Sequence, residues 1–141
     1  MGTQARMTLA DMKRFLDCFN RHDVDGILDF FADDGVYETP RGADPVGKRL
    51  TGKAPIREYF SKMFERMPDT HFGEDSHWLS ADGARGVSEW TLSGTLPDGT
   101  RMQVRGCDHF RFRGEKIALK DSYLKQVQPE VRPGGPRKRS D

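Results

Sequence analysis

The residues best suited to chemistry lie in the segment Asp108-His109-Phe110-Arg111-Phe112. Residues 101–112 alternate between two kinds of side chain, as a half-buried strand does. One face is apolar except for Asp108, whereas the other is rich in arginine. A charged carboxylate buried alone costs several kcal/mol, so Asp108 must be neutral, paired or turned toward a cavity. Each of these states predicts a polar site inside the domain.

The first half of the chain is predicted to hold the helices that would cover this strand. The spacing of apolar residues predicts helices over residues 8–22, 23–35 and 51–67. Thr8 and Thr51 are the expected N-caps, and Gly35 and Pro68 are the expected stops. Between the last two helices we expect a short strand at 36–39 and a loop at 41–50.

After Pro68 the apolar period changes from helical to alternating. This pattern predicts strands over residues 70–79, 86–96, 101–112 and 116–127. Helices followed by an antiparallel meander predict an α+β domain, with the helices on the concave face of a curved sheet. We therefore divide the chain into an N-terminal extension (1–7), one domain (8–127) and a disordered basic tail (128–141).

Composition limits the classes of partner. The 141 residues suit one domain, and a formal charge of +1 with interspersed acids and bases favours neither nucleic acid nor a membrane as partner. No apolar run reaches the roughly 20 residues of a membrane span. With two cysteines expected as free thiols, we expect a cytoplasmic protein. His71 and His77 would lie about 20 Å apart along one strand, so no metal site is expected. No phosphate-binding glycine loop is present in the sequence, and no cofactor is expected.

Three segments resemble the nuclear transport factor 2-like superfamily. They are residues 31–40, residues 52–60 and the strand around Asp108 with Lys116-Ile117 after its turn. Within this superfamily the chain looks most like ketosteroid isomerase and the SnoaL-like polyketide cyclases. The resemblance implies a cone-shaped α+β fold, in which a curved mixed sheet and three N-terminal helices enclose a pocket. Such proteins are usually dimers.

The resemblance to the isomerase carries over only in part. Asp108 falls on its oxyanion-hole aspartate, a carboxylic acid that an apolar site keeps neutral. The position of its general base holds Thr39, which cannot accept a proton at neutral pH, and the position of its hydrogen-bonding tyrosine holds Phe15. Glu38 is one residue away and is expected to point to the opposite face. Ketosteroid isomerisation by that mechanism is therefore not expected.

The last strand leaves two arrangements open. Simple alternation turns Asp121 inward as a second acid beside Asp108, whereas the resemblance turns Lys120 and Ser122 inward, and a bulge could decide between them. Two acids would favour acid–base catalysis, and an inward lysine would neutralise Asp108.

Two functions are compatible with these patterns. The first is a SnoaL-like isomerase, cyclase, dehydratase or hydrolase that acts on a small organic molecule, with Asp108 as acid or hydrogen-bond donor. The second is a non-catalytic small-ligand-binding or dimerisation module of the same fold. The expected pocket residues are Phe15, Phe19, Tyr37, Thr39, Phe60, Met63, Val104 and Ser122. We also expect a homodimer, because Trp90 and Leu92 add large side chains that three helices would not fully cover.

Overall fold

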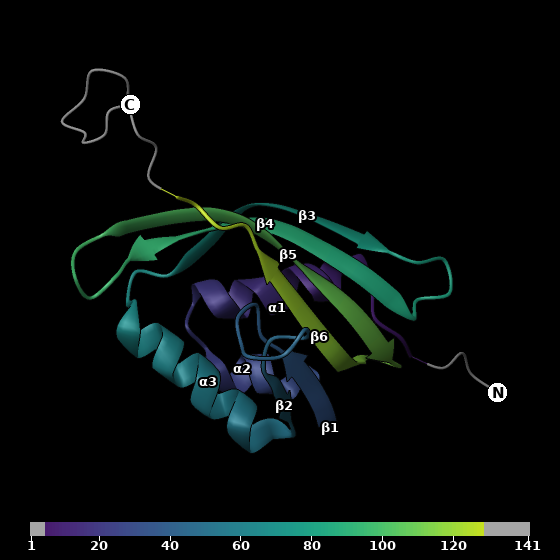
Figure 1. Ribbon diagram of the computed structural model, residues 1–141. Coiled ribbons are helices and arrows are strands. Elements are labelled where there is room, and N and C mark those ends of the chain that lie inside the picture. Colours follow the sequence, from purple (N-terminus) through teal and green to yellow (C-terminus); the bar gives the residue numbers. More distant parts are fainter. Residues whose placement is uncertain (1–4, 129–141) are drawn as a thin grey trace.

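Three helices pack against one face of a curved six-stranded sheet in the computed structural model, which describes residues 5–128 (Figure 1). The helices are α1 (Leu9–Asn20), α2 (Val24–Asp29) and α3 (Lys53–Arg66). The strands are β1 (Phe31–Glu38), β2 (Arg49–Thr51), β3 (His71–Leu79), β4 (Arg85–Thr95), β5 (Arg101–Arg113) and β6 (Lys116–Leu124), in the sheet order β2-β1-β6-β5-β4-β3. β1 and β6 pair in parallel, and the other neighbours pair antiparallel. The predicted α+β fold class is confirmed.

The first helix begins where the sequence predicts. The hydroxyl of Thr8 accepts a hydrogen bond from the backbone N–H of Asp11 at 3.0 Å, and the Asp11 carboxylate accepts one from the backbone N–H of Thr8, also at 3.0 Å. This capping box satisfies two N–H groups that the first helical turn leaves without partners. α1 then places Phe15 and Phe19 in the core.

Two predicted helix boundaries are wrong. α2 ends at Asp29 and not at Gly35, because residues 31–38 form β1, which pairs with β6 at Phe31 and again from Val36 to Glu38. Gly35 lies inside this strand, at a break in its pairing register. Thr51 does not cap α3 but belongs to β2, and Gly52 precedes the helix with a φ of +89° and no side-chain cap.

An extra residue in β6 decides which side chains face inward. The pairing with β5 passes over Ala118, which lies between Ile117 and Leu119. Such a bulge reverses the alternation of side chains beyond it. Ile117 and Lys120 are consequently both buried, and Asp121 is turned toward the outer face.

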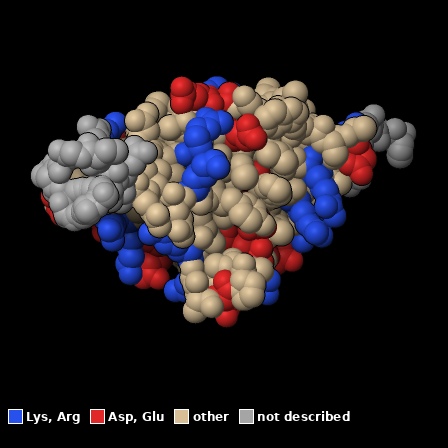
Figure 2. All heavy atoms as spheres, turned by 45° about the horizontal axis from the view of Figure 1, so that its top comes forward, with Lys and Arg blue, Asp and Glu red and all other residues tan. Residues whose placement is uncertain are grey.

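The prediction that Trp90 and Leu92 form an exposed patch is wrong. Their exposed fractions are 3% and 6%, because both point from β4 into the space beneath the helices. Exposed aromatic residues are found instead at Trp78 and Tyr123, each 52% exposed. Figure 2 shows a largely uncharged surface with separate basic and acidic side chains.

The packed part of the chain begins before residue 8. Met7 is 2% exposed, and its backbone N–H donates to the carbonyl of Gly114 at 3.0 Å. The predicted tail, apart from Gln128, lies outside the described residues. Within residues 5–128, no helix is both long and apolar enough to cross a membrane.

Candidate functional site

A cavity of about 470 Å³ lies between α3, the end of α1 and the inner face of the sheet. Six aromatic side chains contribute to its wall: Phe19, Tyr37, Tyr59, Phe60, Phe72 and Trp90. Pockets of this size and apolar character are typical of sites for small organic molecules. Lys120 and Ser122 of β6 and Tyr37 of β1 bring polar groups to the wall from the sheet.

Asp108 is held in a buried network at the sheet side of this cavity. Its Oδ1 lies 3.0 Å from the Nζ of Lys120 and accepts a hydrogen bond from the hydroxyl of Ser122. Its Oδ2 accepts a hydrogen bond from the indole N–H of Trp90 at 3.0 Å. The Nζ of Lys120 also donates to the Ser122 hydroxyl at 2.8 Å. Of the three states open to Asp108 from the sequence, the structure shows the paired one.

Lys120, and not Asp108, is the charged group of this network that reaches the cavity. Asp108 is 3% exposed and does not line the wall, whereas Lys120 is 4% exposed and does. The Nζ of Lys120 lies 4.4 Å from the centre of the Tyr37 ring and within 5.5 Å of the centres of Phe19 and Phe60. Aromatic faces stabilise a cation that has lost its water. The ammonium is thus held at an apolar wall by a buried counter-charge.

Two phenols extend the set of hydrogen-bond donors. Burial, together with the negative charge of Asp108, raises the pKa of Tyr37. Burial and the neighbouring Tyr37 also raise the pKa of Tyr59, and their rings pack edge to face at 5.2 Å. Both phenols therefore keep their protons at neutral pH and can donate hydrogen bonds to a ligand.

The charge on the cavity wall has one sign. Among the described residues, the charged side chains that line it are Arg41, Lys62, Arg66 and Lys120, without an aspartate or glutamate. Such a wall can bind and stabilise negative charge on a ligand. It supplies no carboxylate to remove a proton.

The predicted pocket residues fall into two groups. Phe19, Tyr37, Phe60, Met63 and Ser122 line the cavity. Phe15 does not, because it packs in the core among the rings of Phe19, Phe30, Phe31 and Phe110. Val104 is buried on β5 without reaching the wall.

Thr39 and Glu38 hold the segment after β1 in place. The Thr39 hydroxyl donates to the carbonyl of Arg41 at 2.7 Å and accepts from the backbone N–H of Lys48 at 3.0 Å. The guanidinium of Arg49 donates twice to one oxygen of Glu38, at 2.7 and 2.9 Å. Neither Thr39 nor Glu38 lines the cavity.

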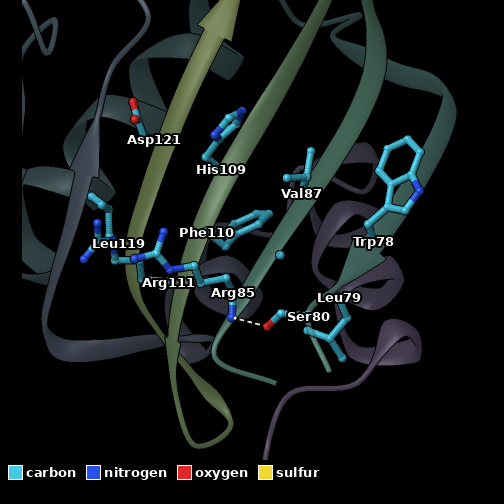
Figure 3. Close-up of a pocket in the computed structure, with 11 residues that line it drawn as sticks. Trp78, Leu79, Ser80, Arg85, Val87, His109, Phe110, Arg111, Leu119 and Asp121 are labelled. Carbon is cyan, nitrogen blue, oxygen red and sulfur yellow. Dashed lines mark hydrogen bonds between the residues drawn. The ribbon is translucent and has the colours of Figure 1, made fainter. Parts of the chain in front are cut away.

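Asp121 and Asp108 do not share a pocket. Asp121 lines a second hollow, of about 460 Å³, on the outer face of the sheet. Figure 3 shows Asp121 and His109 on neighbouring strands, with Val87 and then Trp78 on the strands beyond His109. The carboxylate of Asp121 accepts a hydrogen bond from the hydroxyl of Tyr123 at 3.0 Å. The inward arrangement of Lys120 and Ser122 is the one that this chain adopts.

A partly buried hydrogen-bonded chain of Asp75, His77 and Ser88 lies under α1, and the sequence pattern did not indicate it. The two ring nitrogens of His77 lie 2.7 Å from Ser88 Oγ and 2.7 Å from Asp75 Oδ2. Burial raises the pKa of Asp75, but the hydrogen bonds from His77 and Lys13 outweigh it, so the pKa lies below its usual range. These residue types occur in serine nucleophile sites. However, Ser88 is 3% exposed and lines neither hollow, so no substrate can reach it there.

No metal site is formed by the described residues. Within residues 5–128, no three side chains of the types that bind metals come close enough together to hold an ion.

The comparisons with known proteins agree with this fold. The SnoaL-like domain matches residues 12–120, and the chain therefore belongs to the SnoaL-like family. This confirms the superfamily that the sequence resembles.

Several solved structures share the fold at low sequence identity. A protein described as a candidate polyketide cyclase from Xanthomonas campestris is 20% identical, with a TM-score of 0.73 over 81% of this chain and 87% of that one. A protein with a ketosteroid isomerase-like fold from Catenulispora acidiphila is 19% identical, with a TM-score of 0.72 over 83% and 86%. A candidate isomerase from Bacillus subtilis is 19% identical, with a TM-score of 0.70 over 82% and 84%.

Proposed function

We propose that this chain binds a small, largely apolar molecule in the cavity and stabilises negative charge on one of its oxygen atoms. The observation that carries the proposal is the Lys120 ammonium, which is buried at an aromatic wall and held by Asp108. A cation held in a fixed position at an apolar wall interacts with a developing oxyanion more strongly than the same cation does in water.

The chemistry that suits this arrangement is enolisation of a carbonyl compound. The Lys120 ammonium would face the carbonyl oxygen, with the hydroxyls of Tyr37 and Tyr59 as further donors. Asp108 and Ser122 act as positioning groups, because the Nζ of Lys120 forms an ion pair with Asp108 and donates a hydrogen bond to Ser122. As the α-proton of the ligand leaves for water, negative charge moves to the oxygen and is stabilised there. Double-bond shifts next to a carbonyl and aldol cyclisations both pass through such an enolate, so this chemistry is compatible with neighbours described as a candidate isomerase and a candidate polyketide cyclase.

The experiment measures the acidity of a bound probe, 2-naphthol, whose neutral and anionic forms differ in fluorescence. We expect the folded protein to lower the apparent pKa of bound 2-naphthol relative to free 2-naphthol. The double variant Asp108→Asn/Lys120→Met, which removes both charges together, should abolish the shift. Lys116→Met, at the exposed start of the same strand, should retain it. Binding without a shift in the unmodified protein would refute the role given to Lys120.

A second candidate function is ligand binding without catalysis. It is favoured by the cavity wall, which carries no aspartate or glutamate among the described residues, and by Thr39 at the position where the isomerase has its base. Hydrogen exchange separates the two functions. If the chain is an enzyme of this type, it should accelerate exchange of the α-protons of 2-tetralone in D₂O, measured by NMR. A protein that binds 2-tetralone without accelerating exchange is a binding module.

We also propose that the chain forms a homodimer through the outer face of the sheet. Trp78 and Tyr123 are exposed there beside Val87 and His109, and clustered exposed aromatic side chains are common at interfaces. Light scattering should give about twice the chain mass of 16.0 kDa. Trp78→Glu should shift the population toward monomer, whereas Leu9→Glu, at an exposed position on α1, should not. A monomeric unmodified protein at micromolar concentration would refute the proposal.

A further inference from the structure

We infer that the ligand is an organic acid, whose carboxylate lies among Arg41, Lys62 and Arg66 while its other oxygen faces Lys120. The inference rests on the proposed function, since it concerns the same cavity and adds the chemical class of the ligand. It follows from the kind and position of the charged side chains on the wall.

The three cations come from two elements that meet at the cavity. Lys62 and Arg66 are four residues apart on α3, so both lie on the same side of the helix. Arg41 follows β1, on the segment that Thr39 fastens. All three are exposed, unlike the buried Lys120, and so they mark the solvent side of the cavity.

This local excess of positive charge does not reflect the chain as a whole. The complete sequence has 23 basic and 22 acidic residues, a formal charge of +1. The described residues of the cavity wall nevertheless include four basic and no acidic side chains. A wall of one sign raises the local concentration of ligands of the opposite sign.

The acids of the described chain leave most of this charge free for a ligand. Lys62 lies 3.4 Å from Glu58, but both side chains are about 70% exposed, at 72% and 69%, and such a pair is weak. Arg41 and Arg66 form no ion pair with any described residue at 4.0 Å or less. The charge of Arg66 contributes to lowering the pKa of Asp98, but the two side chains are too far apart to form an ion pair.

Tyr59 connects the exposed and buried ends of the cavity. Burial and Tyr37 raise its pKa, and the charges of both Lys120 and Arg41 act against this rise. Lys120 and Arg41 are therefore each close enough to act on the same phenol. A ligand of two fused rings that contacts Lys120 and passes Tyr59 would bring its far substituent toward Arg41, where it keeps contact with water.

The experiment compares two probes that differ in one carboxylate, 6-hydroxy-2-naphthoate and 2-naphthol. We expect the acid to bind about tenfold more tightly or better, which is the scale of charge-assisted hydrogen bonds. The dissociation constant of 2-naphthol divided by that of the acid should fall toward one in Arg41→Gln and in Arg66→Gln. It should be unchanged in Arg57→Gln, which alters an exposed arginine of the same helix that does not line the cavity.

The outcomes separate this inference from the proposed function. If 2-naphthol binds with its pKa shift and the acid gains nothing, the inference is refuted and the proposed function stands. If neither probe binds, both are refuted. If the acid binds more tightly but responds only to the double variant Asp108→Asn/Lys120→Met, its carboxylate lies at Lys120, and the placement among Arg41, Lys62 and Arg66 is wrong.

Discussion

Replacing Lys120 by methionine should destabilise the protein strongly, because it leaves Asp108 buried without its counter-charge. Methionine keeps the length and apolar stem of lysine, so packing against Tyr37 changes little. Ser122 and Trp90 still donate to the Asp108 carboxylate, but neither is charged. The loss therefore measures the charge of Lys120 more than the volume of its side chain.

The burial of both Lys120 and Asp108 determines how much unfolding free energy Lys120→Met should lose. The side chains of Lys120 and Asp108 are each 5% exposed, and removing one partner of a pair this deep costs about 3–5 kcal/mol. Removing both charges, in Asp108→Asn/Lys120→Met, should cost much less, since no charge is left buried alone. We expect an interaction energy of about 2 kcal/mol or more between the two positions.

The prediction is tested by urea unfolding of four proteins: the unmodified chain, Lys120→Met, Asp108→Asn and the double variant Asp108→Asn/Lys120→Met. With a typical dependence of about 2 kcal/mol per molar urea, Lys120→Met should lower the midpoint by about 2 M. Lys116→Met, which alters an exposed lysine, serves as the control. If Lys120→Met and the double variant lose the same free energy, the stranded charge is not the cause, and the reasoning fails.

Two further predictions concern the hydrogen-bonded chain and one turn. The pKa of Asp75 lies below its usual range in the folded protein, so its stabilisation is present above the unfolded-state pKa and lost as pH falls through the folded one. Asp75→Asn should therefore cost about 1 kcal/mol in urea unfolding at pH 7 and progressively less below about pH 4; a gap that widens in acid would contradict this. Gly47→Ala should cost more than about 2 kcal/mol, because its φ is +76° and a Cβ would lie 1.9 Å from the carbonyl oxygen of Thr39. Gly99→Ala, with a φ of +89° but no neighbour within 4 Å, should cost only about 1 kcal/mol, and equal thermal stability of the two variants would refute the steric argument.

The general fold could be predicted because local patterns and global packing agree. The Thr8 capping box and the alternation of β5 each depend on residues close together in the sequence. The end of α2 could not be predicted in this way. Residues 31–35 follow directly after a helix, but they belong to a strand that pairs at Phe31 and again from Val36 onward with β6, about 85 residues later in the chain.

Residue alternation alone could predict the candidate site only up to the bulge in β6, whereas the family resemblance predicted the inward Lys120 and Ser122 that the structure shows. The sequence shows that Asp108 lies on an apolar face, but whether Asp121 or Lys120 faces it depends on one extra residue, Ala118. Nothing in the composition of that segment marks the bulge. The single sign of charge on the cavity wall could not be predicted either, because only the fold brings Arg41 and Arg66 to the same cavity.

The position of β6 in the sheet affects the order in which the chain can fold. This strand lies between β1 and β5, yet it is synthesised after every other strand of the sheet. Until it leaves the ribosome, β1 and β5 each keep an unpaired edge, and such edges tend to associate with other chains. Because Lys120 and Ser122 also arrive with β6, a nascent chain lacks the proposed ligand site before the sheet is complete. A ligand could therefore favour folding only after synthesis has passed this strand, and a chain interrupted before it would expose two edges that no ligand can protect.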